Sequence, residues 1–326
     1  MINTKKEISG LGVRKEESSF RSRDGKTQLR SVSWIPESKP RAVLQIIHGM
    51  NEYLDRYDRF ACFLAEKGFY VTGEDHLGHG KSVPEGGIYG YFSDGDSATV
   101  LVRDVHRLKK ITQERTGDRD EVPYFMLGHS LGSLILRNYL PFYGKDLDGA
   151  LILGTTTLSQ PAITADAVLL KSMIAVRGGR HVSKKAAAFA FGKYLSRIDH
   201  PRTFYDWISK DEAEVERFIK DPLCSGFTIT LGGLETMVEL CRRMQLKGVL
   251  SRMPQKLPVL IAAGAQDPVG EYGADPLTLY DTYLNLDMTK VTVKIYPGMR
   301  HEILNETDRE KVYADIYNWL SSLVNR

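Results

Sequence analysis

Hydrophobic positions along the chain follow two different periods, one typical of strands and one typical of helices. Residues 42–47 form a nearly continuous apolar run, as in a strand that is buried on both faces. Residues 59–67 then carry apolar side chains at helical spacing, and residues 69–72 again form an apolar strand-like run. Because strand, helix and strand follow one another, we expect parallel pairing and an α/β fold.

The same alternation extends over most of the chain. Residues 18–36 alternate polar and apolar side chains around Asp24-Gly25, which predicts a β-hairpin. Helices are predicted over residues 96–115, 130–143, 231–250, 276–286 and 308–324, and strands over residues 122–127, 149–153, 257–263 and 291–296. The predicted sheet is mostly parallel and is flanked by helices.

This alternation stops between residues 155 and 227, where helical patterns follow one another without a convincing strand. Such an interruption is typical of a helical insertion placed after a strand. We therefore expect an α/β core in two parts, residues 1–155 and 230–326, with residues 156–229 as a helical cap between them.

Inside this predicted cap, an apolar segment precedes a basic one. Residues 163–176 are largely apolar, and residues 177–193 carry several lysine and arginine side chains. Such a pair suits transient contact with an anionic membrane surface. The commoner explanation is ordinary packing beneath a solvated helix face. Both interpretations stay open on the sequence alone.

Composition narrows the class of protein without identifying it. Hydrophobic residues make up 42% and charged residues 26% of the 326 positions, as in ordinary globular proteins. The net charge of +3 gives no indication of a nucleic-acid partner. The first 20 residues are polar, so we expect no signal peptide, and no apolar run reaches the length of a membrane span. The three distant cysteines lack metal-ligand spacing, which predicts reduced thiols in a cytoplasmic protein.

The chemistry is concentrated where the apolar run 124–127 meets a predicted helix at Gly128-His129-Ser130-Leu131-Gly132. In a Gly-x-Ser-x-Gly turn, a sharp strand-to-helix corner exposes the serine hydroxyl at the end of the sheet. The two glycines are expected because side chains at positions 128 and 132 would collide in this corner. Ser130 is therefore the candidate nucleophile.

Residues 75–82 read Asp-His-Leu-Gly-His-Gly-Lys-Ser, and their end is similar to a phosphate-binding loop. The glycine that such a loop requires is missing at Asp75, and Pro84 disfavours the helix that should follow. His76 and His79 also suggest metal ligands, but no further residues complete a recognisable shell. We interpret the segment as a loop held by its own polar side chains.

Acyl transfer by a serine requires a base, a carboxylate that orients the base, and donors for the oxyanion. Ser130, Asp267 and His301 each follow a predicted parallel strand, at the edge where ligands bind in open α/β sheets. Their order along the chain is typical of this architecture. We assign Ser130 as nucleophile, His301 as general base and acid, and Asp267 as the group that fixes the His301 tautomer.

Other histidines and carboxylates are weaker candidates. His129 adjoins the nucleophile, but neighbouring side chains in the elbow point away from each other, and His48 is expected to be structural. Asp275 and Asp287 lie in or beside a predicted helix rather than at a strand end. The remaining histidines in helical or insertion segments are His106, His181 and His200.

The oxyanion donors are predicted to be the backbone N–H groups of Leu131, which follows the nucleophile, and of Met50 in the His48-Gly49-Met50 turn. A side-chain substitution at either position leaves its N–H group in place. The flexible Met50 side chain is also expected to shape an apolar pocket.

These motifs together resemble the monoglyceride lipase and bacterial lysophospholipase group of α/β-hydrolases. The resemblance extends over nearly the whole chain, in the family's order, and rests on residues 48–52, 75–82, 128–132, the loop at Asp267, residues 298–302, and the segments 204–211 and 221–224. Two positions depart from the family pattern, Ser133 after the elbow and Thr156 before the predicted cap. Both departures are expected to affect the pocket entrance and not the triad.

The resemblance implies hydrolysis of a carboxylic ester of the monoacylglycerol or lysophospholipid type, beneath a cap, without a cofactor or metal. The fold group also contains thioesterases and proline-releasing aminopeptidases, so another acyl hydrolase, including one acting on aryl esters, is an alternative. A ligand-binding protein that does not use the site is a further alternative. The sequence does not indicate the natural ester, the oligomeric state, or whether the acyl group passes to water.

Overall fold

The computed structural model describes residues 4–8, 12–118 and 120–324, and its centre is one nine-stranded sheet in the order β1-β2-β3-β5-β4-β6-β7-β8-β9. From β5 to β9 all neighbouring strands are parallel, while β1, β2, β3 and β5 pair antiparallel. The strands are β1 (Thr4–Ile8), β2 (Val13–Arg21), β3 (Gln28–Pro36), β4 (Ala42–Ile47), β5 (Phe69–Glu74), β6 (Tyr124–His129), β7 (Gly149–Leu153), β8 (Val259–Gly264) and β9 (Val291–Tyr296).

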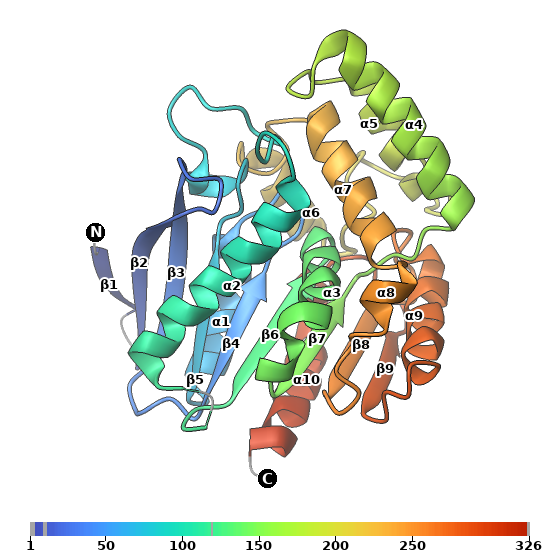
Figure 1. Cartoon of the computed structure of the whole chain (residues 1–326). Coiled ribbons are helices and arrows are strands. Elements are labelled where there is room, and N and C mark those ends of the chain that lie inside the picture. Colours follow the sequence, from blue (N-terminus) through green and yellow to red (C-terminus); the bar gives the residue numbers. More distant parts are fainter. Residues whose placement is uncertain (1–3, 9–11, 119, 325–326) are drawn as a thin grey trace.

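Helices cover both faces of this sheet (Figure 1). One hydrophobic core joins the sheet to α2, α3 and α9, and a second core on the opposite face joins it to α1 and α10. The helices of the core are α1 (Asp58–Ala65), α2 (Ser97–Thr116), α3 (Leu131–Tyr143), α7 (Leu231–Arg243), α8 (Lys247–Leu250), α9 (Ala274–Leu284) and α10 (Arg309–Val324). The architecture confirms the predicted α/β fold with a mostly parallel sheet.

Between β7 and α7, the described chain forms helices and loops, with one isolated β-bridge between Val182 and Thr230. Its helices are α4 (Gln160–Arg177), α5 (Lys184–Phe191) and α6 (Glu212–Lys220). In Figure 1, α4 and α5 project above the carboxyl ends of the parallel strands. We call residues 156–229 the insertion. Within the described ranges, no helix combines the length and apolar content that a membrane crossing requires.

The element boundaries agree with the sequence predictions in most places. The predicted strands over residues 42–47, 149–153 and 291–296 coincide with β4, β7 and β9. The prediction of one helix over residues 231–250 was wrong, because α7 ends at Arg243 and α8 begins at Lys247. The N–H groups of Gln245 and Leu246 bond to carbonyls three residues back, and this tighter turn separates the two helices. Strand β1 was not predicted.

A buried arginine connects the antiparallel part of the sheet to the loops beneath it. The Arg30 side chain is only 7% exposed and pairs with Glu17 at 2.5 Å, Asp55 at 3.0 Å and Asp75 at 3.1 Å. Burial raises the pKa of Asp75, and the charge of Arg30 opposes this shift. Asp75 also accepts the backbone N–H groups of Leu54 and Lys81, so this one carboxylate orders the 75–82 loop.

We expect Arg30→Met to lower the free energy of unfolding by about 3–5 kcal/mol, because it leaves a buried carboxylate without its cation. Urea denaturation measures this change. The matched control is Lys26→Met, since Lys26 pairs with Asp94 where both side chains are more than half exposed. The control should cost about 1 kcal/mol or less. Equal losses in both variants would contradict this account of the Arg30 cluster.

Candidate active site

The nucleophile elbow predicted from sequence is present between β6 and α3. Ser130 has φ 53° and ψ −119°, a strained conformation for a residue with a side chain. Its N–H donates to the Leu153 carbonyl at 3.0 Å, which fixes the elbow to the end of the neighbouring strand β7. The local sequence therefore places the serine hydroxyl at the carboxyl edge of the sheet, directly before α3.

Both elbow glycines have the steric role that was predicted. A Cβ atom at Gly128 would lie 2.4 Å from the Gly132 carbonyl oxygen. A Cβ atom at Gly132 would lie 1.9 Å from the carbonyl oxygen of Ile47, at the end of β4. The second contact was not anticipated, because it joins the elbow to a strand far away in sequence. Position 132 thus sets how closely α3 approaches β4.

His301 and Asp267 are brought together by the ends of two neighbouring strands, β9 and β8. The His301 Nδ1 atom lies 3.0 Å from each carboxylate oxygen of Asp267, and both side chains are buried. A carboxylate is an acceptor, so Nδ1 carries the proton and Nε2 keeps a free lone pair. Gly154 makes room for the ring, since a Cβ atom there would lie 3.0 Å from His301 Cε1.

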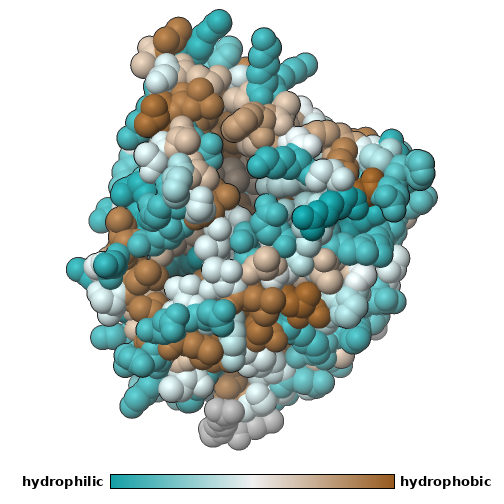
Figure 2. All heavy atoms as spheres, turned by 90° about the vertical axis from the view of Figure 1, so that its right-hand side faces the viewer, coloured by the Kyte–Doolittle hydropathy of each residue, from teal (hydrophilic) through white to brown (hydrophobic). Residues whose placement is uncertain are grey.

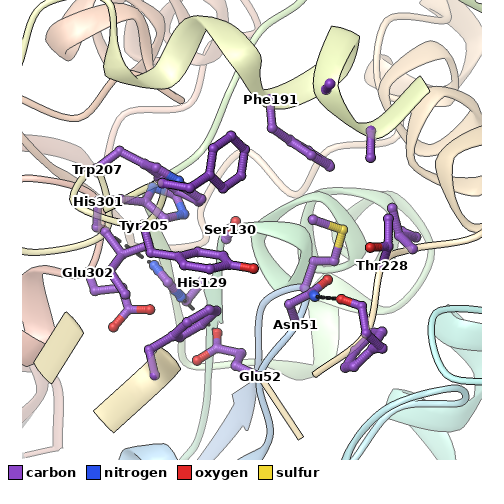
Figure 3. Close-up of a pocket in the computed structure, with 18 of the residues that line it drawn as sticks. Asn51, Glu52, His129, Ser130, Phe191, Tyr205, Trp207, Thr228, His301 and Glu302 are labelled. Carbon is purple, nitrogen blue, oxygen red and sulfur yellow. Dashed lines mark hydrogen bonds and ion pairs between the residues drawn. The ribbon is translucent and has the colours of Figure 1, made fainter. Parts of the chain in front are cut away.

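Ser130 and His301 both line one pocket of about 220 Å³. Figure 3 shows the two side chains facing this pocket from different segments, with Phe191, Tyr205 and Trp207 around them. The indole of Trp207 packs beside the base, with ring centroids 5.2 Å apart. Asp267 lies behind His301 and does not line the pocket. His301 therefore lies between the pocket that Ser130 also lines and the carboxylate of Asp267.

The predicted oxyanion donors lie beside the nucleophile. A Cβ atom at Gly49 would be 3.1 Å from Ser130 Cβ, so the 48–50 turn contacts the elbow directly. In the described part of the chain, neither the Met50 N–H nor the Leu131 N–H donates to a protein acceptor. Met50 also lines the pocket, as predicted for its side chain. The 48–50 turn and the residue after Ser130 thus each contribute a backbone N–H group beside the elbow.

The loop over residues 75–82 is held by its own polar groups, as interpreted from the sequence. Ser82 Oγ donates to the Asp75 carbonyl at 2.6 Å, in addition to the bonds of the Asp75 carboxylate described above. His76 N–H donates to His48 Nε2 at 3.0 Å, and His48 Nδ1 donates to the Gly49 carbonyl at 2.7 Å. Across the described residues, no group of three or more His, Cys, Asp or Glu side chains is arranged to hold a metal ion.

Asp275, one of the two other carboxylate candidates, and both departures from the family pattern have hydrogen-bond partners in the structure. Asp275 accepts the Thr156 hydroxyl at 2.9 Å and the Thr157 N–H at 2.8 Å. Ser133 Oγ donates to the Ser130 carbonyl at 2.6 Å. Among the described residues that line the pocket, neither Ser133 nor Thr156 occurs, and their expected effect on the pocket entrance stays a prediction. Ser133 bonds to the backbone of the elbow and Thr156 bonds to Asp275.

A group of buried charged residues beside the triad was missed. Arg56 forms a bidentate pair with Glu302 at 2.6 and 2.7 Å, and lies 3.5 Å from Glu52. Glu52 is in turn 3.0 Å from His129 Nδ1, and these partners and Tyr57 hold the pKa of Glu52 at about 2 against its burial. The sequence contained a signal, because Glu52 and Arg56 have helical i,i+4 spacing and Glu302 directly follows His301.

The insertion is joined to the histidine loop by backbone hydrogen bonds. His301 N–H donates to the Trp207 carbonyl at 3.4 Å, and Glu302 N–H donates to the Ile208 carbonyl at 2.7 Å. Arg300 donates to the carbonyl of Ser209 at 3.1 Å. Residues 206–209 therefore hold the segment that carries the base, although they lie about 90 positions earlier in the chain.

The sheet, the elbow and the His301–Asp267 pair together define an α/β-hydrolase. The family model for Hydrolase_4, described as serine aminopeptidase S33, matches residues 38–308. The chain belongs to this family, and it is a hydrolase of the α/β class.

Curated relatives and solved structures agree with this assignment. A monoacylglycerol lipase from Mycolicibacterium smegmatis is 27% identical over 94% of this chain and 98% of its own length. The crystal structure of a thermostable carboxyl esterase from Bacillus coagulans in complex with glycerol is 32% identical, covers 95% of this chain and 99% of that chain, and has a TM-score of 0.87. The structure of a lipase in an open form is 25% identical, covers 96% of this chain and 100% of that chain, and has a TM-score of 0.84.

We expect Gly132→Ala to destabilise the protein by about 3 kcal/mol or more, because the new methyl group collides with a backbone oxygen that has no room to move. Thermal unfolding and esterase assays measure stability and activity together. The control is Gly248→Ala on α8, where nothing lies within 4 Å of the added Cβ. This control should keep or slightly raise the melting temperature. A Gly132→Ala variant as stable and active as wild type would refute the close contact between α3 and β4.

Proposed function

We propose that this protein is a serine hydrolase that cleaves carboxylic esters through an acyl-enzyme intermediate. The observation that carries the proposal is the placement of the strained Ser130 and the Asp267-oriented His301 on one pocket. The names of relatives support an ester substrate, since they include monoacylglycerol lipases and a carboxyl esterase. In this proposal Ser130, His301 and Asp267 are the catalytic triad.

The proposed reaction follows from the tautomer of His301. Because Nδ1 donates to Asp267, the Nε2 lone pair accepts the proton of the Ser130 hydroxyl as Oγ bonds to the ester carbon. The imidazolium then protonates the departing alcohol, and the acyl group stays on Oγ. Water repeats the sequence and releases the acid. No cofactor is required for any of these steps.

Backbone N–H groups of Met50 and Leu131 form the proposed oxyanion hole. Both lie beside Ser130 and keep their donors free, as described above. The strained elbow begins α3, so the helix N-terminus adds partial positive charge where the oxyanion forms. The loss of one such donor typically reduces turnover by about 10²–10³. The donors are preorganised and need no rearrangement during the reaction.

The pocket supports a single-chain lipid ester as the substrate class. Most of its lining comes from the insertion, which we propose acts as the cap of the site. The apolar lining side chains from the insertion include Ala187, Ala188, Phe191, Phe204, Phe218 and Phe227. Such a wall suits an acyl chain, whereas the polar groups of the site lie near Ser130. We propose monoacylglycerol or lysophospholipid-type esters, in the cytoplasm, where the buried free thiols of Cys62, Cys224 and Cys241 remain reduced.

We expect Ser130→Ala to abolish hydrolysis of p-nitrophenyl esters while the melting temperature is retained. For the wild type, kcat/KM should rise with acyl length to a medium or long chain, since each buried methylene contributes about 0.8 kcal/mol. The measurement is a series from acetate to palmitate with both proteins side by side. Retained activity in Ser130→Ala would refute the nucleophile, and a Ser130-dependent preference for acetate would refute the lipid substrate alone.

We further propose that the outer face of the insertion contacts anionic membranes during substrate uptake. Figure 2 shows hydrophobic side chains gathered over the insertion at the top of the molecule, beside a hollow. Val176 is 80% exposed and Phe189 is 68% exposed. Exposed basic side chains on the same segments are Lys171, Arg177, Lys184, Lys185 and Lys193. An apolar face with basic neighbours suits binding at a lipid interface.

The double substitution Val176→Ser with Phe189→Ser should reduce hydrolysis of monoacylglycerol in anionic vesicles by about tenfold or more, because each lost side chain removes about 1.5 kcal/mol of burial. Hydrolysis of a water-soluble short-chain ester should not change. Phe142→Ser is the matched control, since Phe142 is 53% exposed at the far end of α3. Equal activity of the double variant and the control on vesicles would contradict membrane contact.

A further inference from the structure

His129 lies behind the catalytic base with both ring nitrogens directed at acceptors. Its Nδ1 atom is 3.0 Å from Glu52 Oε1, and its Nε2 atom is 3.4 Å from the carbonyl oxygen of His301. The rings of His129 and His301 are 4.8 Å apart. The side chain is buried, with 5% exposure, and it contributes to the lining of the pocket. This arrangement places a titratable group in direct contact with the triad.

A neutral imidazole has one donor and one acceptor nitrogen, so it cannot donate to both of these oxygens. The Tyr57 hydroxyl is 3.0 Å from His129 Nδ1 and 2.7 Å from Glu52 Oε1, and it has one proton to give. If that proton pointed at Nδ1, the carboxylate of Glu52 would face the Nδ1 lone pair at 3.0 Å. The imidazolium form avoids this repulsion, because Nδ1 and the hydroxyl then both donate to Glu52.

The buried charges around His129 are balanced only when His129 is an imidazolium. Burial lowers the pKa of His129, but the hydrogen bond and charge of Glu52, together with Glu302, overcome burial and raise it. Arg56 is shared between Glu52 and Glu302. His48 is also near, and burial and neighbouring histidines hold its pKa well below the usual value, so it adds no charge. Two carboxylates are thus matched by the Arg56 guanidinium and the His129 imidazolium.

Glu52 connects this cation to the 48–50 turn, to Tyr57 and to the elbow. Its Oε1 atom accepts the N–H of Gly49, the hydroxyl of Tyr57 and Nδ1 of His129. Gly49 directly precedes the oxyanion donor Met50, and His129 directly precedes the nucleophile. On the other side, His129 Nε2 faces the backbone of His301. One ion pair therefore lies between the oxyanion turn, the elbow and the loop of the base.

We propose that His129 is an imidazolium at neutral pH, and that the buried Glu52–His129 ion pair is the positioning element of the active site. Neither side chain takes the proton of Ser130 or contacts the reacting atoms. They hold the Met50 and Leu131 donors and the His301 ring in one geometry. The inference rests on the proposed serine mechanism for its effect on rate, but the charge state of His129 is independent of that mechanism.

The proposal gives a definite sign for the pH dependence. A histidine whose pKa is higher in the folded than in the unfolded state contributes stability that is complete below its unfolded pKa of about 6.5. That stability is lost as the pH rises through the folded pKa. The rate of ester hydrolysis should decline over the same pH range, because the Glu52–His129 ion pair is lost when His129 loses its proton. Removal of the Glu52 charge should move this alkaline decline to lower pH.

The charge state is tested directly by long-range ¹H–¹⁵N NMR of the wild-type chain with labelled histidine. At pH 7, one buried histidine should show both ring nitrogens protonated, and this signal should be missing in His129→Gln. The same histidine should be neutral at pH 7 in Glu52→Gln. If no buried histidine is an imidazolium at pH 7 in the wild type, the proposal is refuted without any variant.

The positioning role is tested by pH profiles of kcat and KM for Glu52→Gln on a short-chain ester. We expect kcat to fall by about 10- to 100-fold with little change in KM, since a small misplacement of reacting groups has that effect. The alkaline decline should also shift to lower pH. Glu216→Gln is the matched control, because Glu216 is exposed and forms an ion pair with Lys220 on α6. An unshifted alkaline decline in Glu52→Gln refutes the positioning role, whereas activity in Ser130→Ala refutes the serine mechanism alone.

Discussion

The backbone contact between Gly132 and the Ile47 carbonyl is the constraint on which the site depends. It allows α3 to begin directly above the end of β4, and the strained Ser130 is held between that contact and its hydrogen bond to Leu153. Because β4, β6 and β7 are parallel and in register at this edge, the elbow, the 48–50 turn and the end of β7 converge. The strain at one serine is therefore supported by three neighbouring strands.

Much of this arrangement could be predicted because its signals are local. The apolar runs at residues 42–47, 257–263 and 291–296 predicted strands β4, β8 and β9, and Asp267 and His301 lie in the segments that follow β8 and β9. Their proximity in space was predicted from the general rule that the carboxyl ends of parallel strands meet at one edge of a sheet. The relation of Ser130, Asp267 and His301 to their own strands was therefore sufficient to predict that they lie at one edge of the sheet.

The remaining features depend on contacts between distant segments, which a single sequence does not display. The break between α7 and α8 depends on the turn at Gln245. The side-chain amide of Gln245 donates to the Leu158 carbonyl at 2.6 Å. The pairing of Arg56 with Glu302 joins residues 246 positions apart, and each residue alone is an ordinary surface type. His129 was set aside because elbow side chains diverge, yet its ring turns back beneath His301. Buried charge is the feature that composition and periodicity describe least well.

The backbone bonds from His301 and Glu302 to residues 207 and 208 have a consequence for how this fold can be recombined. The segment belongs to the insertion by sequence, but by contact it is part of the catalytic core. An exchange of insertions between relatives that cut the chain at residues 156 and 229 would remove a support of the His301 loop together with most of the pocket lining. The natural unit of exchange is the α4–α5 half alone, whose helices bury few side chains and whose removal leaves the histidine loop attached.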